Sequence, residues 1–235
     1  MPEFHYQEIF SPGEDKTPYR KLTDKFVSTI NVDGKEVLKI EPEALELITA
    51  QAMKDVSHLL RPAHLQQLAN ILEDDEASEN DKFVATELLK NANVAAGMIL
   101  PGCQDTGTAI IMGKKGQYVW TEGQDKAAIS KGVFKTYTET NLRYSQLAPI
   151  SMFDEKNTGT NLPAQIDIYA TDSNSYEFLF VTKGGGSANK SFLHQAVPSV
   201  LAPDRLLPYI QEKLYELGTA AFPPYHLSVV IGGTS

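Results

Sequence analysis

The sequence predicts an α+β fold, with an N-terminal helical region followed by a mixed β-sheet region with flanking helices. Two observations support this class. Apolar residues recur at three- and four-residue spacing through 42–97, which is the period of an α-helix, whereas beyond Pro101 short β-type segments are mixed with helical ones. Because the helices come first and the later elements do not alternate regularly, the order favours α+β over a doubly wound parallel sheet.

The N-terminal part predicts an extended arm followed by a β-hairpin. Residues 1–20 hold three prolines and little periodicity, so we expect an arm lying on a surface. Two β-type segments, 26–32 and 36–40, flank Asp33-Gly34. That dipeptide suits the positive φ angles of a type I′ turn, which indicates a hairpin.

The first expected helix begins at Pro42, because proline suits the first turn of a helix. It ends before Pro62 and has one apolar stripe, formed by Leu45, Ile48, Ala52, Val56 and Leu59. A second helix is expected at about 63–72.

A third helix is expected to begin after Ser78, which forms a candidate capping box with Asp81. His58 and His64 also lie in the helical region. We interpret them as packed or surface residues and assign them no function, because a single histidine in a helical bundle is more often structural than a ligand.

Beyond Pro101 the expected strands and helices are mixed. Strands at 108–112 and 118–120 lie around a Lys115-Gly116 turn, and a helix follows at 125–142. The remaining expected elements are strands at 165–170 and 176–182 joined by a turn at 172–174, a helix at 204–217 and a strand at 226–231. The chain ends directly after that strand, where a βα connection normally starts, so we expect residues 1–235 to be one N-terminal domain, truncated at its C-terminal end.

Composition excludes several classes of function. A chain of 235 residues with 42% hydrophobic residues can form a packed core. Its net charge of −9 and its scattered basic residues disfavour nucleic-acid binding. No apolar run reaches the length of a membrane span, and the N-terminus lacks the apolar core of a secretory signal, so a cytoplasmic protein is the simplest interpretation. The one cysteine, Cys103, excludes an internal disulfide and fits a reducing compartment.

Three segments are dense in glycine, amide and hydroxyl groups and lie at the ends of expected elements. The first, 101–108, places the thiol of Cys103, the amide of Gln104 and the carboxylate of Asp105 side by side. A thiolate can bind a soft metal, and an adjacent carboxylate can move a proton on a substrate. On spacing alone, an ordinary turn with a buried cysteine remains the favoured alternative.

The other two segments are 141–146 and 183–190. Arg143 in the former offers a guanidinium fork that matches a carboxylate, and is equally compatible with a cation at a helix end. The three glycines of the latter allow a ligand to approach the backbone and suggest an anion nest, but the spacing fits neither the P-loop nor the dinucleotide fingerprint. A nucleotide enzyme is therefore the less favoured interpretation.

Five sequence blocks together resemble, in order and spacing, the N-terminal half of class I, iron–sulfur-dependent fumarate hydratases. The blocks are LPGCQDTGTAII (100–111), NLRYSQLAP (141–149), NTGTNLPAQIDIY (157–169), KGGGSANKSFL (183–193) and GTAAFPPYHLSVVIGGTS (218–235). The resemblance extends from about Phe4 to Ser235 and outweighs the alternatives above. It implies a hydro-lyase that interconverts fumarate and malate.

The resemblance also implies roles for single residues. Family members bind a four-iron four-sulfur cluster through three cysteines and leave one iron open as a Lewis acid, and Cys103 matches the first of these ligands. By analogy, Gln104 and Asp105 contact the substrate, with Asp105 taking part in proton transfer. Arg143 binds a carboxylate, and the backbone at Gly186 contributes to the pocket. The remaining substrate-binding and base residues of the family lie in its C-terminal domain.

One departure from the family pattern concerns the cluster. Phe222 stands where the family has its second cysteine, and the third would fall beyond Ser235. Phenylalanine has no lone pair to offer iron, so this chain alone is expected neither to hold the cluster nor to hydrate fumarate. The expected partners are a C-terminal fumarase domain and a second copy in a homodimer. The alternatives are a hydro-lyase acting on tartrate or methylfumarate, and a non-catalytic assembly module of the same fold.

Overall fold

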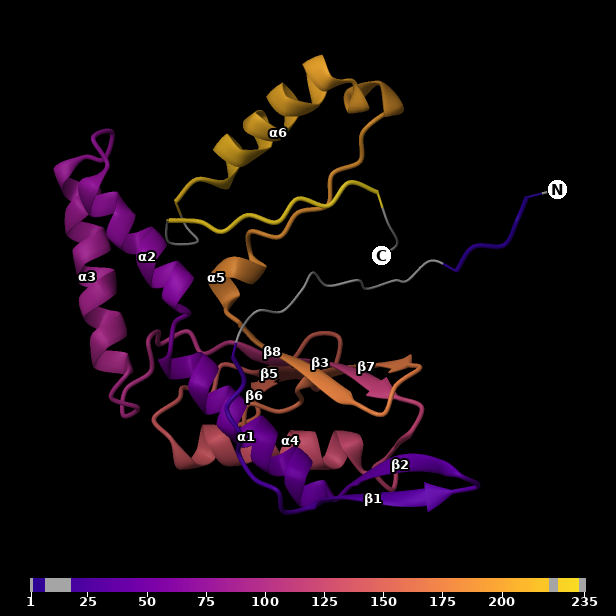
Figure 1. The fold of residues 1–235 in the computed structure, drawn as a ribbon. Helices are drawn as coiled ribbons and strands as arrows, with labels where there is room; N and C mark the ends of the chain where they lie inside the picture. Colours follow the sequence, from indigo (N-terminus) through magenta and orange to yellow (C-terminus); the bar gives the residue numbers. More distant parts are fainter. Residues whose placement is uncertain (1, 7–17, 220–223, 233–235) are drawn as a thin grey trace.

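The computed structural model describes residues 2–6, 18–219 and 224–232, and it confirms the α+β class (Figure 1). The elements are, in chain order, β1 (Val27–Val32), β2 (Lys35–Ile40), α1 (Pro42–His58), α2 (Pro62–Asn70), η1 (Ile71–Glu73), α3 (Glu79–Ala95), β3 (Thr108–Gly116), β4 (Val119–Trp120), α4 (Asp125–Glu139), β5 (Leu147–Pro149), β6 (Glu155–Asn157), β7 (Gln165–Thr171), β8 (Tyr176–Lys183), α5 (Gly185–Ala188), η2 (Pro198–Leu201) and α6 (Pro203–Leu217). Within the described ranges, no helix is long and apolar enough to cross a membrane.

The expected hairpin is confirmed as β1 and β2, which pair antiparallel with Val32 opposite Lys35. Asp33 and Gly34 have φ angles of 49° and 80°, as a type I′ turn requires. Of the expected arm, the structure describes residues 2–6 and 18–20. Residues 2–6 are exposed, with Phe4 85% exposed, so the expectation of an arm lying on a surface is wrong for this part. Arg20, by contrast, contacts α1, since its guanidinium lies 2.6 Å from the carboxylate of Asp55.

The central sheet has the strand order β7-β3-β8, with β7 parallel and β8 antiparallel to β3. The expected Lys115-Gly116 turn is wrong, because both residues belong to β3 and the short β4 pairs with β2. The 172–174 turn crosses the end of β3, where a Cβ on Gly116 would collide with the backbone of Ser173. At the opposite end, Thr108 of β3 pairs with Lys183 of β8, so the segments before β3 and after β8 meet at one edge of the sheet.

The core lies between this sheet and the crossed helices α1 and α4, which lie beneath it in Figure 1. Gly132 of α4 allows the helices to approach closely, since a Cβ there would lie 2.6 Å from Cβ of Thr49 in α1. The fully buried core residues include Met53, Ala109, Ile111, Ile129, Val133 and Tyr137. α4 ends at Glu139, not at 142 as expected, because Thr140 is extended and the chain turns to bury Leu142 in the core.

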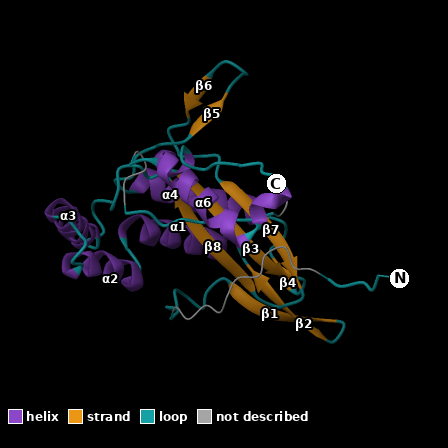
Figure 2. Cartoon of the chain, turned by 90° about the horizontal axis from the view of Figure 1, so that it is seen from above, coloured by secondary structure: helices purple, strands orange, loops and turns teal. Residues whose placement is uncertain are grey.

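The helices α2 and α3 stand at one side of the molecule, and the β5–β6 hairpin, which was not expected, projects from it (Figure 2). The capping box of α3 is confirmed: the Asp81 amide donates to Ser78 Oγ, and the Ser78 amide donates to Asp81 Oδ2. This caps two of the free N–H groups at the start of α3.

The last described part of the chain lies apart from the central sheet (Figure 1). The expected helix is confirmed as α6, but the expected strand at 226–231 is wrong: these residues form no strand, and Val230 is 80% exposed. A strand needs a neighbouring strand for its backbone hydrogen bonds, and none of the described strands pairs with this segment. Phe222 lies outside the described residues.

Candidate active site

The loop that carries Cys103 is anchored before its tip. The Gly102 amide donates to the carbonyl of Ser57 at 2.9 Å, and the Gly102 carbonyl accepts from Nδ2 of Asn91 at 2.6 Å. Cys103 and Gln104 follow directly and are both exposed. The alternative of a turn with a buried cysteine is therefore wrong, and the thiol is accessible to a ligand.

Asp105 connects Cys103 to the triple-glycine turn. Its amide donates to Sγ of Cys103 at 3.4 Å, and its Oδ2 accepts from the amide of Gly186 at 3.4 Å. A Cβ on Gly184 would lie 2.5 Å from the same Oδ2, so glycine is needed there for close approach. The structure thus brings the Cys103 loop, with Asp105, to Gly186, which lies 81 positions further along the chain than Asp105.

Arg143 reaches this group through its backbone. Thr106 Oγ1 donates to the carbonyl of Arg143 at 2.5 Å, while the Arg143 side chain is exposed. α4 ends at Glu139, so Arg143 is beyond its last turn and does not act as a helix-end cation. The segment after α4 is thereby held beside the Cys103 loop.

Tyr137 supports the same loop from inside the core. Its hydroxyl donates to the carbonyl of Thr106 at 2.9 Å, and burial raises the pKa of Tyr137 to about 12. The hydroxyl therefore remains a proton donor at physiological pH.

Asn161 is a site-supporting residue that the sequence analysis did not identify. It is 0% exposed and has a φ of 57°. Its Oδ1 accepts from the amides of Ser145 and Gln146, and its Nδ2 donates to the carbonyl of Gly107, all at 2.9 Å. The residue type was the one weak indication of this role in the sequence: asparagine tolerates a positive φ better than most residues, so the asparagine before Leu162 is suited to such a backbone position.

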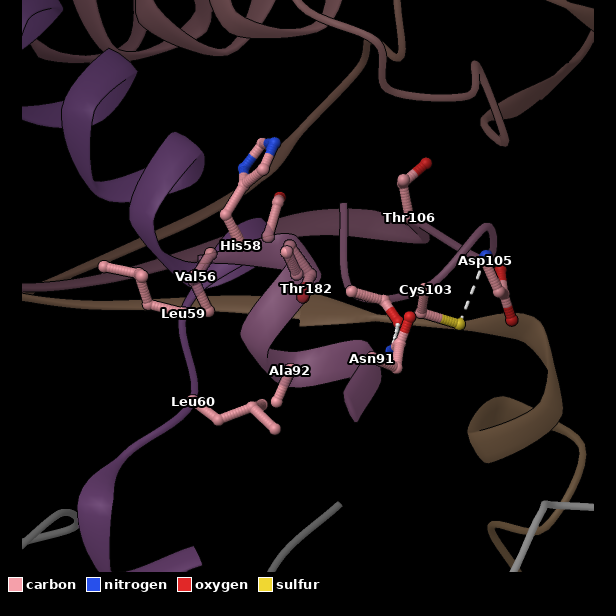
Figure 3. A pocket seen from close by; sticks show the side chains of 13 residues that line it. Val56, His58, Leu59, Leu60, Asn91, Ala92, Cys103, Asp105, Thr106 and Thr182 are labelled. Atoms are coloured by element: carbon pink, nitrogen blue, oxygen red, sulfur yellow. Dashed lines mark hydrogen bonds between the residues drawn. The ribbon is translucent and has the colours of Figure 1, made fainter. Parts of the chain in front are cut away.

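A cavity of about 150 Å³ opens beside the loop, between the end of α1 and α3 (Figure 3). One part of its wall is apolar, and another is formed by Cys103, Asp105 and Thr106. His58 also belongs to its wall, but it is 2% exposed and its ring points away from Cys103 in Figure 3. Its Nδ1 lies 2.8 Å from the Lys54 carbonyl, which confirms the interpretation of a packed residue.

His64 likewise has a structural contact. It is partly exposed, and its Nδ1 lies 2.8 Å from Nε2 of His226, in the segment after α6. This agrees with the interpretation of a surface residue.

The described donors do not by themselves fit an iron–sulfur cluster. Cys103 is the single cysteine of the sequence, and the described ranges contain no group of three or more His, Cys, Asp and Glu side chains that could hold a metal ion. Of the three thiolates that a cubane cluster with three protein ligands requires, this sequence therefore supplies one.

The model of the family described as fumarate hydratase (fumerase) matches residues 46–235. The chain belongs to the fumarate hydratase family. It is 58% identical over 232 residues to the class I aerobic fumarate hydratase of Escherichia coli K12, covering 99% of this chain and 42% of that protein. It is 53% identical to the mitochondrial fumarate hydratase 1 of Leishmania major, covering 100% of this chain and 43% of that protein.

A more distant similarity joins this fumarate hydratase family member to a tartrate dehydratase subunit. The putative L(+)-tartrate dehydratase subunit alpha of Methanocaldococcus jannaschii is 28% identical over 205 residues, covering 84% of this chain and 68% of that protein. The chain spans about two fifths of the length of the fumarate hydratases it matches.

Proposed function

We propose that this chain is the N-terminal part of a hydro-lyase that reversibly hydrates fumarate to malate, in the cytoplasm. The observation that carries the proposal is the meeting of Cys103, Asp105 and the Gly186 amide at one edge of the sheet, at the positions that the resemblance assigns to the site. The 58% identity to a class I fumarate hydratase along nearly the whole chain supports it.

Each proposed role matches the chemistry of its group. Asp105 is partly buried and its carboxylate accepts from the Gly186 amide beside the Cys103 loop, so it can exchange a proton with a substrate held there. Gln104 at the exposed tip can donate to or accept from a substrate oxygen, and the Arg143 guanidinium can pair with a carboxylate. The Gly186 amide contributes to the pocket through the backbone, since it donates to the Asp105 carboxylate.

Cys103 is the proposed ligand of a four-iron four-sulfur cluster in the complete enzyme. When bound, such a cluster supplies a Lewis acid for hydration chemistry. Because one thiolate cannot replace three, we expect the isolated chain to be inactive. Anaerobic reconstitution with iron and sulfide should leave no stable brown species, and a stable brown species with fumarate turnover would contradict this expectation.

The proposed partner is the polypeptide that follows the matched part in the longer relatives, including the C-terminal fumarase domain. α6 has no buried residue although its sequence is strongly amphipathic, and apolar side chains around it, among them Leu193, Leu207 and Val230, are exposed. A surface of this kind is typical of an interface. A second copy in a homodimer is the other proposed partner.

The decisive experiment joins this chain to the remaining part of the E. coli aerobic relative. The fusion carries either Phe222 or Phe222→Cys, and fumarate hydration is followed by the loss of its ultraviolet absorbance. We expect turnover only with Phe222→Cys, its loss in Asp105→Asn, and its retention in the control Asp172→Asn, which lies in an exposed turn. A cluster-loaded fusion that does not hydrate fumarate would refute the proposal.

The similarity to tartrate dehydratase subunits favours one alternative, a hydro-lyase acting on tartrate or methylfumarate. Related dicarboxylates share the same carboxylate clamp and differ in contacts to one substituent. The ratio of kcat/KM values for fumarate, methylfumarate and tartrate in the same fusion separates these substrates. The Phe222 departure favours the other alternative, a non-catalytic assembly module, which predicts binding to the following domain without turnover even in the Phe222→Cys fusion.

A further inference from the structure

Three asparagine side chains from three different segments donate hydrogen bonds to backbone carbonyls on both sides of Cys103. Nδ2 of Asn141, directly after α4, donates to the Ile99 carbonyl at 3.0 Å. The Nδ2 atoms of Asn91 and Asn161 donate to the carbonyls of Gly102 and Gly107 at 2.6 Å and 2.9 Å. We call Asn91, Asn141 and Asn161 the asparagine clamp.

We propose that the asparagine clamp positions the tip of the Cys103 loop for ligand binding. Carbonyls before and after the tip are fixed, while Cys103 and Gln104 between them remain exposed. Fixed flanking peptides restrict the directions in which the thiol can project. A thiol that is already oriented loses less conformational entropy when it binds a metal or a substrate. Supporting hydrogen bonds assist metal and substrate sites in this way.

Asn161 has the central place in the clamp. Its buried amide group uses both of its ends: Oδ1 holds the amides of Ser145 and Gln146, and Nδ2 holds Gly107. It therefore joins the segment after α4 to the start of β3. A substitution that removes only the donor end would release the Gly107 carbonyl while leaving the other two bonds of Asn161 in place.

The other two members separate positioning from general stability. Asn91 and Asn141 are exposed, so loss of their single hydrogen bonds should change global stability little. Their bonds nevertheless end on residues within four positions of Cys103. If the clamp positions the loop, these exposed substitutions loosen the tip in a protein that remains folded.

Cys103 provides the probe, because it is exposed and is the single cysteine of the sequence. A nitroxide spin label attached to it reports the mobility of the loop by electron paramagnetic resonance. We expect Asn91→Asp and Asn141→Asp, which replace the donor by an acceptor of equal size, to shift the spectrum to narrower, more mobile lines. The control Asn174→Asp, in the exposed turn at the other end of the sheet, should leave it unchanged.

Asn161→Asp is tested by hydrogen exchange with mass spectrometry, since its carboxylate still accepts from Ser145 and Gln146. We expect faster exchange in 99–107 and unchanged exchange in the core helix α4. Faster exchange throughout the core would indicate a merely structural role and overturn the proposal for Asn161. If Asn161→Asp does not fold, Asn91→Asp and Asn141→Asp provide the test. Unchanged spin-label spectra in both of these variants would overturn the proposal.

The proposal rests on the proposed function in one respect, namely that Cys103 is a ligand. The label and exchange measurements need neither iron nor substrate, so they can succeed or fail independently of hydratase activity. If the fusion were inactive but the asparagine variants showed a more mobile loop tip, the proposed activity would be refuted and the proposed role of the asparagine clamp would stand.

Discussion

The narrow space between Asp105 and Gly184 can be tested by adding one methyl group at Gly184. A Cβ on Gly184 would lie 2.5 Å from Asp105 Oδ2, whereas a Cβ on Gly185 would lie 3.9 Å from it, which is ordinary contact. We expect Gly184→Ala to lower the free energy of unfolding by about 1–3 kcal/mol, as overpacking does, and Gly185→Ala to have a smaller effect. Urea denaturation measures both, and equal effects would show that the carboxylate is not confined there.

The buried hydroxyl of Tyr137 gives a second test. Tyr137→Phe leaves the Thr106 carbonyl without this donor, so we expect a loss of about 1–3 kcal/mol in the free energy of unfolding. The control is Tyr215→Phe, because Tyr215 is 77% exposed and should tolerate the change. Equal thermal denaturation of both variants would exclude a stabilising role for the Tyr137 hydrogen bond.

Residues of the site differ in how far the sequence could predict them. Cys103, Asp105 and Gly186 stand out because their local composition is unusual and the sequence blocks resemble a family. The contribution of Asn161 comes from three bonds to residues far along the chain, and no local pattern encodes such contacts. The expected roles of all five site residues remain predictions, for Cys103, Asp105 and Gly186 as for Gln104 and Arg143.

Helices and strands show the same division between local and long-range information. The capping box at Ser78 and the turn at Asp33-Gly34 depend on neighbouring residues, and both were predicted correctly. The pairing of β3 was predicted wrongly, because its partners β7 and β8 lie beyond the next helix in the sequence. The strand at 226–231 failed for a related reason: the segment has the composition of a strand but no described partner.

A polar cluster at the end of β3 remote from Cys103 joins three elements. Asp125, at the start of α4, accepts from Lys115, Thr121 and Tyr176 at 2.5–3.1 Å. Burial acts to raise the pKa of Asp125, but the hydrogen bonds from Thr121, Lys115 and Tyr176 outweigh it and lower that pKa below its usual 3.8. Burial and the Asp125 charge raise the pKa of Tyr176, which keeps it a donor.

This lowered pKa predicts a loss of stability in acid. The unfolded chain binds the proton more readily than the folded one, so the contribution of Asp125 is present above pH 3.8 and is lost as the pH falls through the folded-state pKa. We expect Asp125→Asn to lower the melting temperature at neutral pH and to reduce its further fall below pH 3.8. The matched control is Asp172→Asn. A melting temperature that falls equally steeply in acid for Asp125→Asn and for wild type would contradict the assignment.

For the chain as a whole, the exposed apolar surface around α6 predicts association. Leu207 is 71% exposed, and self-association would bury it in the absence of the following polypeptide. We expect light scattering to detect oligomers of the isolated chain and Leu207→Lys to shift them toward monomer. The control Gln211→Lys adds the same charge at an exposed polar position of α6. A wild-type chain that stays monomeric at high concentration would argue against association through the apolar surface around α6.

The register between β3 and β8 limits how this protein can change during evolution. Side chains alternate between the two faces of a strand, so inserting or deleting one residue within either strand would turn Ala109 or its neighbours outward. It would also displace the glycines by about 3.4 Å along the strand, away from Asp105. Homologous genes are therefore expected to keep constant lengths through these two strands and to vary in length in the projecting β5–β6 hairpin.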